Sequence, residues 1–134
     1  MNKRELALEY LNRCKKRLEA LKFLYNEKSY ADVVREAQEI VELCGKGILR
    51  SVGIDPPKWH DVGVLVIELL DKYPKFRKKF KKYAEISGWL RREGEFAFYG
   101  DIDFIPSEKY TKKDANEALK GAEFSIKLLE EFLK

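Results

Sequence analysis

Two arginines, a tyrosine and an aspartate lie close together in the sequence, and they could hold a phosphate beside a hydroxyl group. Arg91 and Arg92 precede Tyr99 and Asp101 by seven to ten positions. A guanidinium group binds two phosphate oxygens at once, so the cluster suits a phosphate ester, with the tyrosine hydroxyl as the nearby nucleophile. Arginines and acids at a helix end also form ordinary surface ion pairs. Both interpretations stay open at this stage.

A second candidate site is a run of cations interleaved with aromatic residues, made up of Lys72, Lys75, Arg77, Lys78, Lys79, Lys81 and Lys82. At helical spacing the aromatic residues turn inward and the cations form an exposed face. Such a face either binds RNA or nucleotide phosphates with salt-sensitive affinity or simply keeps the helix soluble. We take Lys78, Lys79 and Lys82 as the predicted ligand-binding members.

Metal and thiol chemistry have little support in the sequence. His60 is the single histidine, so one chain cannot build a histidine-rich metal site. Cys14 and Cys44 are thirty positions apart without a CxxC pair, and each falls on an apolar stripe. We predict that they are reduced core residues, and we expect neither a metal nor a cofactor.

Length and composition restrict the class of protein. The 134 residues suffice for one domain, predicted to cover residues 1–134, and the content of 45% hydrophobic and 37% charged residues excludes a disordered chain. The longest uncharged apolar run, residues 62–67, is far shorter than the ~20 residues that cross a bilayer. The start lacks the pattern of a secretory signal, so we expect a cytoplasmic protein without membrane contact. The net charge of +4 permits an acidic partner. The abundance of Lys and Glu is a bias also seen in proteins from thermophiles.

The elements that must position the candidate groups are helices. Apolar residues recur at three- and four-residue steps in four long segments, at about 3–25, 29–52, 75–97 and 112–133, and a further helix is expected from residue 60 or 61 to residue 73. Asn2 with Glu5 and Thr111 with Asp114 resemble capping boxes. The connection at residues 99–110 is long for a helical domain and is therefore a place to look for function. We predict an all-α fold, a four- to five-helix up-down antiparallel bundle.

Three blocks of sequence carry a resemblance to a known family. They are residues 30–39, residues 59–62, and residues 99–101 together with 110–115. Their order and spacing, with the helix plan, resemble the HEPN domain family, and the resemblance covers nearly the whole chain. It implies a helical bundle that is usually a homodimer. It also implies a partner, a minimal nucleotidyltransferase, with which the protein forms a toxin-antitoxin pair.

The resemblance also assigns roles to the first cluster. Ribonuclease members of the family carry an R-x4-6-H motif, often extended to R-x4-H-x-Y, in a metal-independent site at the dimer interface. Arg92 matches the arginine and Tyr99 the tyrosine, but Ala97 stands at the histidine position. A methyl group cannot exchange a proton, so the general acid or base is missing, and we interpret the distant His60 as a local capping or packing group. In related pairs the motif tyrosine accepts AMP, which makes Tyr99 a candidate modification site.

Three functions remain open. The first is a dimeric HEPN protein with little or no catalytic activity, which binds a nucleotide, an RNA or a nucleotidyltransferase through Arg91, Arg92, Tyr99 and the basic run. The second is an endoribonuclease toxin, in which Arg92 positions the phosphate and Tyr99 or Asp101 replaces the histidine. The third is a structural adaptor with an aromatic contact patch formed by Trp59, Trp89 and Phe98. We favour the first, in which the protein has little or no enzymatic activity; if it is an enzyme, we expect an endoribonuclease.

Overall fold

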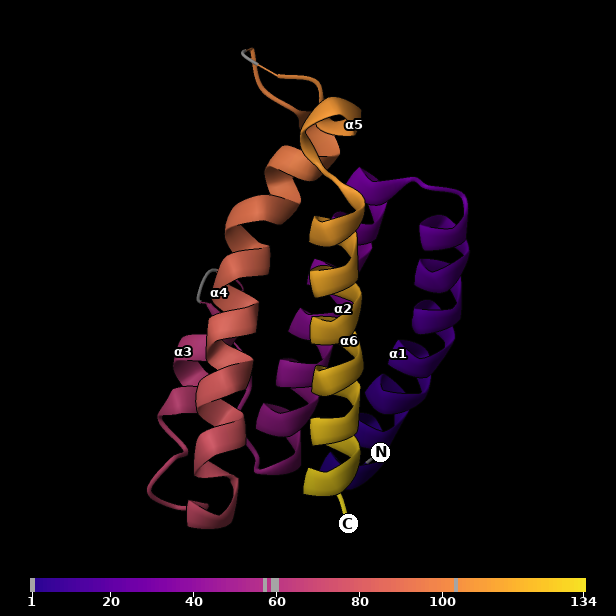
Figure 1. The fold of residues 1–134 in the computed structure, drawn as a ribbon. Helices are drawn as coiled ribbons and strands as arrows, with labels where there is room; N and C mark the ends of the chain where they lie inside the picture. The colour runs from indigo at the N-terminus through magenta and orange to yellow at the C-terminus, as the bar shows by residue number, and fades with distance from the viewer. Residues whose placement is uncertain (1, 57, 59–60, 103) are drawn as a thin grey trace.

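Four long helices that run alternately up and down make the body of the protein. The computed structural model describes residues 2–56, 58, 61–102 and 104–134. Figure 1 shows the long helices, which are α1 (Lys3–Asn26), α2 (Tyr30–Ser51), α4 (Arg77–Tyr99) and α6 (Lys112–Phe132). Shorter elements are α3 (Val62–Ile67), the 3-10 helix η1 (Pro74–Phe76) and α5 (Pro106–Lys109). The predicted all-α bundle is confirmed.

Reciprocal side-chain caps fix where the first and last long helices begin. The Asn2 side chain accepts a hydrogen bond from the backbone N–H of Glu5 at 2.8 Å, and the Glu5 carboxylate accepts one from the Asn2 backbone. Thr111 and Asp114 form the same pair at the start of α6. Each pair satisfies two backbone N–H groups that would otherwise lack partners. The two capping boxes predicted from the sequence are therefore present.

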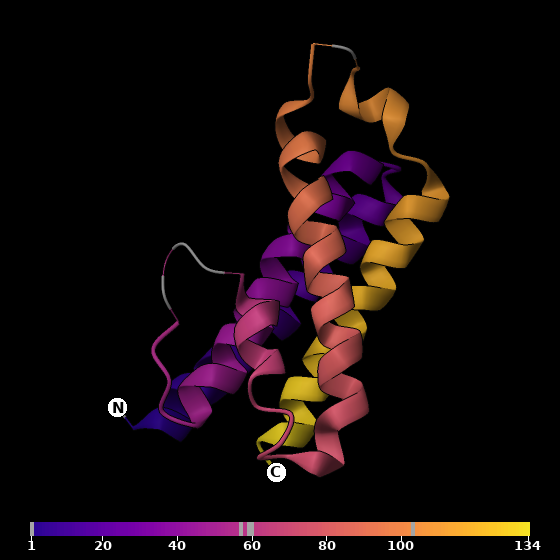
Figure 2. The same ribbon diagram turned by 90° about the vertical axis from the view of Figure 1, so that its left-hand side faces the viewer.

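Helix α2 lies at the centre of the bundle and packs against α1, α4 and α6. Its residues Val33, Val34, Ala37, Ile40, Val41, Cys44, Ile48 and Leu49 are all fully buried. The side view in Figure 2 shows α4 in front of α2 and α6, with both chain ends near the lower end of the bundle. The buried side chains of the long helices thus form a continuous apolar core around α2.

The segments between the long helices differ from the sequence prediction. Helix α3 ends at Ile67, because the N–H groups of Glu68, Leu69 and Leu70 bond three residues back, and further turns follow up to Tyr73. Helix α4 follows a 3-10 turn and continues two residues beyond Ala97. The connection at residues 99–110 contains α5 and an isolated bridge between Asp101 and Phe104. The predictions made for Trp59 and His60 lie outside the described residues.

Candidate functional site

Arg92 and Tyr99 share the outward face of α4. They are seven residues apart, which is two turns of helix and about 10 Å along its axis. Both side chains are exposed, and Tyr99 keeps 72% of its surface open to solvent. Helix α4 stops directly after Tyr99, because Gly100 has a φ of +78° and its N–H bonds to the Phe96 carbonyl. The tyrosine hydroxyl is therefore displayed at the end of a helix.

Ala97, at the position of the motif histidine, faces the opposite way. It is five residues after Arg92, a rotation of about 140° around the helix, and it is only 2% exposed. Its neighbour one turn back, Gly94, is also buried, and a Cβ atom added there would lie 2.0 Å from the Gln38 amide oxygen. The described structure therefore brings Arg92 and Tyr99 to one surface, whereas position 97 is part of the packing between helices.

Arg91 and Asp101 do not join this pair. The Arg91 Nη1 atom lies 4.0 Å from Glu42 Oε1, so this guanidinium turns toward α2. The Asp101 carboxylate accepts a hydrogen bond of 2.6 Å from the backbone N–H of Ile102. Asp101 therefore stabilises the loop after α4 and, in the described part of the chain, is not paired with Arg92. The predicted four-residue cluster is therefore split between two faces of α4 and the loop that follows.

Two residues that the sequence analysis did not select hold the aromatic residues beside Tyr99. The guanidinium carbon of Arg35, on α2, lies 5.0 Å from the centre of the Phe98 ring, and that ring lies 4.6 Å from the Tyr99 ring. Lys109, on α5, lies 5.5 Å from the Phe96 ring and 3.5 Å from a Glu93 carboxylate oxygen. Such cation-aromatic pairs stabilise a partly exposed ring in place. Arg35 lies within the block at residues 30–39, but nothing in the local sequence indicates its partner.

Tyr110 links the end of the 99–110 connection to α4 by hydrogen bonds. Its hydroxyl lies 3.1 Å from both the carbonyl oxygen and the carboxylate of Glu93. Burial and the neighbouring Glu93 carboxylate raise the pKa of Tyr110 well above the ordinary tyrosine value. The hydroxyl therefore stays protonated and can donate to Glu93 at any physiological pH.

Several large exposed apolar side chains lie close to Tyr99 in the chain. We call this group the α4 tip, and it consists of Phe96, Phe98, Tyr99, Ile102 and Ile105, with exposures from 42% to 96%. Figure 1 shows this part of the chain projecting beyond the end of the four-helix body. A group of exposed apolar side chains of this kind marks a surface for interaction with another molecule. From the sequence, only the length of the 99–110 connection pointed to this region, and the apolar residues in and before it were a further signal that the sequence analysis did not use.

The three lysines predicted to bind a ligand lie near the start of α4, apart from Arg92. Lys79 forms an ion pair with Glu131 of α6, and the Lys82 Nζ atom lies 4.5 Å from the Phe124 ring of the same helix. Lys78 is exposed. Ten residues separate Lys82 from Arg92, which corresponds to about 15 Å along the helix. The predicted ligand-binding residues thus form two groups rather than one.

Trp89 and Phe98 do not form a common aromatic patch. They are nine residues apart on α4, which places them on opposite sides of the helix. Trp89 packs against the core, whereas Phe98 is 54% exposed.

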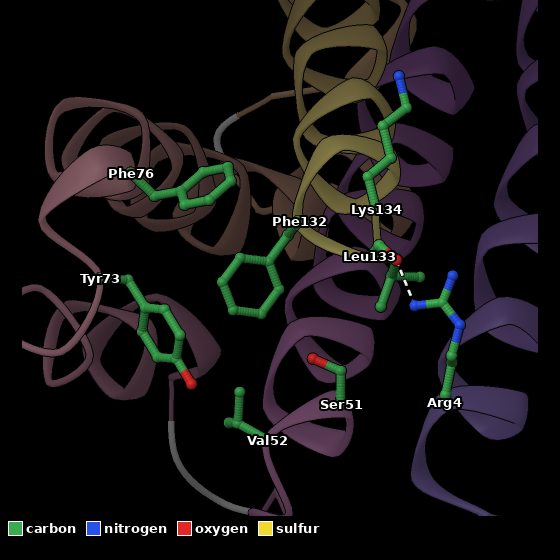
Figure 3. Close-up of a pocket in the computed structure, with 8 residues that line it drawn as sticks. All are labelled: Arg4, Ser51, Val52, Tyr73, Phe76, Phe132, Leu133 and Lys134. Atoms are coloured by element: carbon green, nitrogen blue, oxygen red, sulfur yellow. Dashed lines mark hydrogen bonds between the residues drawn. The ribbon is translucent and has the colours of Figure 1, made fainter.

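A surface cavity of about 450 Å³ opens at the other end of the bundle (Figure 3). It is lined by Arg4, Ser51, Val52, Tyr73, Phe76, Phe132, Leu133 and Lys134. Arg4 donates a hydrogen bond to the Leu133 carbonyl, and the Phe132 ring meets the rings of Tyr73 and Phe76 edge-on at 5.1 and 5.2 Å. These contacts attach α6 to α1 and to the segment around η1, so the residues that line the cavity help to hold the helices together.

Among the residues that the structure describes, no group of three or more His, Cys, Asp and Glu side chains is arranged to hold a metal ion. None of their helices combines the length and the apolar character needed to cross a membrane.

The fold and the site together define a small up-down helical bundle whose candidate site is an exposed helix face with an apolar tip. The HEPN domain model matches residues 7–132, and the chain belongs to the HEPN domain family. A protein of Methanocaldococcus jannaschii named "Putative toxin MJ1304" is 28% identical over 132 residues, which cover 93% of this chain and 86% of that protein. The comparison with solved structures gave no significant match.

Proposed function

We propose that this protein is the HEPN component of a toxin-antitoxin-type pair, and that Tyr99 accepts AMP from a minimal nucleotidyltransferase. The observation that carries the proposal is the 72% exposure of Tyr99 at the end of α4. In the transfer, the tyrosine oxygen attacks the α-phosphorus of ATP and pyrophosphate leaves. The hydroxyl proton passes to a base of the nucleotidyltransferase. The name of the similar protein from M. jannaschii supports a toxin-type role.

The α4 tip supplies the surface on which such an enzyme would dock. A large protein partner needs apolar contacts around the hydroxyl that it modifies, and Ile102 and Ile105 are 96% and 56% exposed next to Tyr99 in the chain. Arg92 lies on the same face as Tyr99, and its guanidinium group can pair with the phosphate of a nucleotide. This placement supports a role for Arg92 in phosphate binding.

Ribonuclease catalysis is not part of the proposal, because the position at which the family motif carries its proton-transfer group holds an alanine. Ala97 stands in place of the motif histidine and is buried. Arg92 can still neutralise a phosphate, but neutralisation alone supplies neither a general acid nor a general base. RNA or nucleotide binding without cleavage is therefore the expected behaviour of the isolated protein.

Nucleotidyl transfer to Tyr99 can be tested by mass spectrometry. The protein is incubated with ATP, Mg²⁺ and the nucleotidyltransferase encoded beside it, and the intact mass is measured. We expect a gain of one AMP group in the wild type and in Tyr25→Phe, a matched tyrosine change on α1, but none in Tyr99→Phe. AMP transfer to Tyr99→Phe, or no transfer to the wild type, would contradict the proposal.

RNA binding and RNA cleavage are tested together with a labelled RNA mixture. We expect Arg92→Ala to weaken binding, whereas Arg13→Ala, a matched exposed arginine on α1, leaves it unchanged. Binding should also fall as salt rises, because bound cations release counterions from the phosphates. RNA cleavage that the wild type shows and Arg92→Ala loses would favour the endoribonuclease toxin instead.

We also propose that the protein is a homodimer, as the family implies, so that each dimer carries two copies of Arg92 and Tyr99. Light scattering at micromolar concentration tests it directly. A monomeric mass would remove the dimer from the proposal and leave the Tyr99 reaction to be judged by its own experiment.

A further inference from the structure

Two thiol groups meet in the core, far from the α4 tip. Cys14 lies on α1 and Cys44 on α2, and both are fully buried. Their sulfur atoms are 3.6 Å apart, with the Cys44 thiol donating to the Cys14 sulfur. These are the only two cysteines of the chain. Helical packing has thus brought together two nucleophilic groups that are thirty positions apart in the sequence.

The separation is short enough for a covalent link. The sulfur atoms of a disulfide are about 2.0 Å apart, so rotation of the two side chains and a small shift of the helices must bring them about 1.6 Å closer. Cys14 Sγ also contacts the Ile40 carbonyl oxygen, but at 3.7 Å this hydrogen bond is weak. Tyr83, which packs nearby, directs its hydroxyl to the Val41 carbonyl at 2.6 Å. The Tyr83 hydroxyl is therefore bonded to the backbone, while the two sulfur atoms contact each other.

The two thiols differ in acidity. The hydrogen bond from Cys44 lowers the pKa of Cys14, with smaller contributions from the charges of Arg17 and Arg13, while burial opposes the shift. Burial raises the pKa of Cys44. Cys14 is therefore the better nucleophile and Cys44 the partner that resolves the oxidised sulfur.

We propose that Cys14 and Cys44 are a site of oxidative modification, at which a small peroxide forms an intramolecular disulfide that links α1 to α2. The Cys14 thiolate attacks a peroxide oxygen, so the O–O bond breaks and a sulfenic acid forms. The Cys44 sulfur then attacks the sulfenic sulfur, and the S–O bond breaks with loss of water. In total, two thiols and one hydrogen peroxide give one disulfide and two waters.

The disulfide stabilises the fold and does not touch the proposed Tyr99 site. It closes a loop of about thirty residues, which lowers the conformational entropy of the unfolded chain. Helices α1 and α2 are already packed against each other, so the link needs no change of topology. In reducing conditions the two residues remain buried thiols, as expected from the sequence.

The test uses the full chain, oxidised in two ways. The folded protein is treated with hydrogen peroxide, and a reduced, unfolded sample is refolded with reduced and oxidised glutathione, so that a core closed to peroxide can be told from a fold that cannot accommodate the link. Both samples are then unfolded, alkylated and weighed. We expect the loss of two hydrogen atoms, no alkylation, and a melting temperature higher by on the order of 10 °C that dithiothreitol reverses.

Two variants and three outcomes make the test decisive. Cys14→Ala and Cys44→Ala should each fold, lack the intramolecular link and show no rise in melting temperature on oxidation. Two alkylated thiols in the peroxide-treated wild-type sample would overturn the proposal, and a disulfide in the refolded sample alone would show only that the fold can accommodate the link. Addition of oxygen atoms without a disulfide, or a disulfide that lowers the melting temperature, would also overturn the proposal.

Discussion

The guanidinium carbon of Arg35 on α2 lies 5.0 Å from the centre of the Phe98 ring on α4. This pair joins the central helix to the helix end that displays Tyr99, because the Phe98 ring also lies 4.6 Å from the Tyr99 ring. Arg35 is itself oriented by Gln38, at 3.3 Å, and by Glu39, at 3.6 Å. The position of the candidate site thus depends on a contact between residues 63 positions apart.

A double-mutant cycle should detect this contact. We expect Arg35→Ala and Phe98→Ala to be coupled by about 0.5–1 kcal/mol in the free energy of unfolding, since the pair is partly exposed. Urea unfolding of the two single variants and the double variant gives the value. Arg35→Ala paired with Phe124→Ala serves as the control cycle, because Phe124 lies against Lys82 instead. Strictly additive effects of Arg35→Ala and Phe98→Ala would show that the contact adds nothing to stability.

The close approach of α2 and α4 at Gly94 gives a second prediction. A Cβ atom at Gly94 would lie 2.0 Å from the Gln38 amide oxygen, so Gly94→Ala must displace that side chain. We expect a loss of about 1–3 kcal/mol in the free energy of unfolding. Gly88→Ala, in the same helix, is the matched control. Its added Cβ meets only Arg92 Nη1 at 3.6 Å, so the change should stabilise the helix by about 0.5–1 kcal/mol. Equal effects of the two changes would contradict the packing described at Gly94.

Tyr83 should make the protein less stable in alkaline solution. Burial, followed by the nearby Cys44 and Glu42, raises the pKa of Tyr83 well above the ordinary value of 10. Above pH 10 the unfolded chain loses this proton while the folded chain keeps it, so the free energy of unfolding falls by about 1.4 kcal/mol per pH unit. Urea unfolding at a series of pH values from 8 to 11.5 should give a smaller slope for Tyr83→Phe. An identical slope in the variant would show that the hydroxyl ionises in the folded state.

Much of the fold could be predicted because its signals are local. The apolar spacing identified the four long helices, and the pairs Asn2–Glu5 and Thr111–Asp114 identified two of their starts. The prediction was less accurate for the short elements between the long helices. Residues 68–72 keep an apolar pattern, and Leu69 is buried, yet they form turns rather than helix. Periodicity reports which side chains are buried but does not distinguish a helical turn from successive tight turns.

The candidate site could be predicted only in part, because its geometry depends on how helices pack. The sequence predicted that the fourth helix ends near residue 97 and placed Tyr99 in the following connection, whereas α4 extends to Tyr99 and so carries Arg92 and Tyr99 on one face. The sequence could not indicate that Arg91 turns to Glu42, that Lys79 pairs with Glu131, or that Arg35 covers Phe98. Each of these contacts joins residues more than 45 positions apart, and no local pattern encodes them.

Restoring the motif histidine tests whether position 97 is a catalytic position in this fold. Ala97 is 2% exposed on the inward face of α4, about 140° around the helix from Arg92. An imidazole there must be accommodated within the packed interior, so we expect Ala97→His to lower the free energy of unfolding by about 1–3 kcal/mol. The introduced ring should not approach a phosphate held by Arg92, and RNA cleavage should therefore remain absent. Urea unfolding and a gel assay with labelled RNA measure the two effects, and Phe98→His, on the exposed surface one residue along, is the control. Cleavage gained by Ala97→His and abolished by Arg92→Ala would show that the end of α4 rearranges to bring residue 97 to the surface.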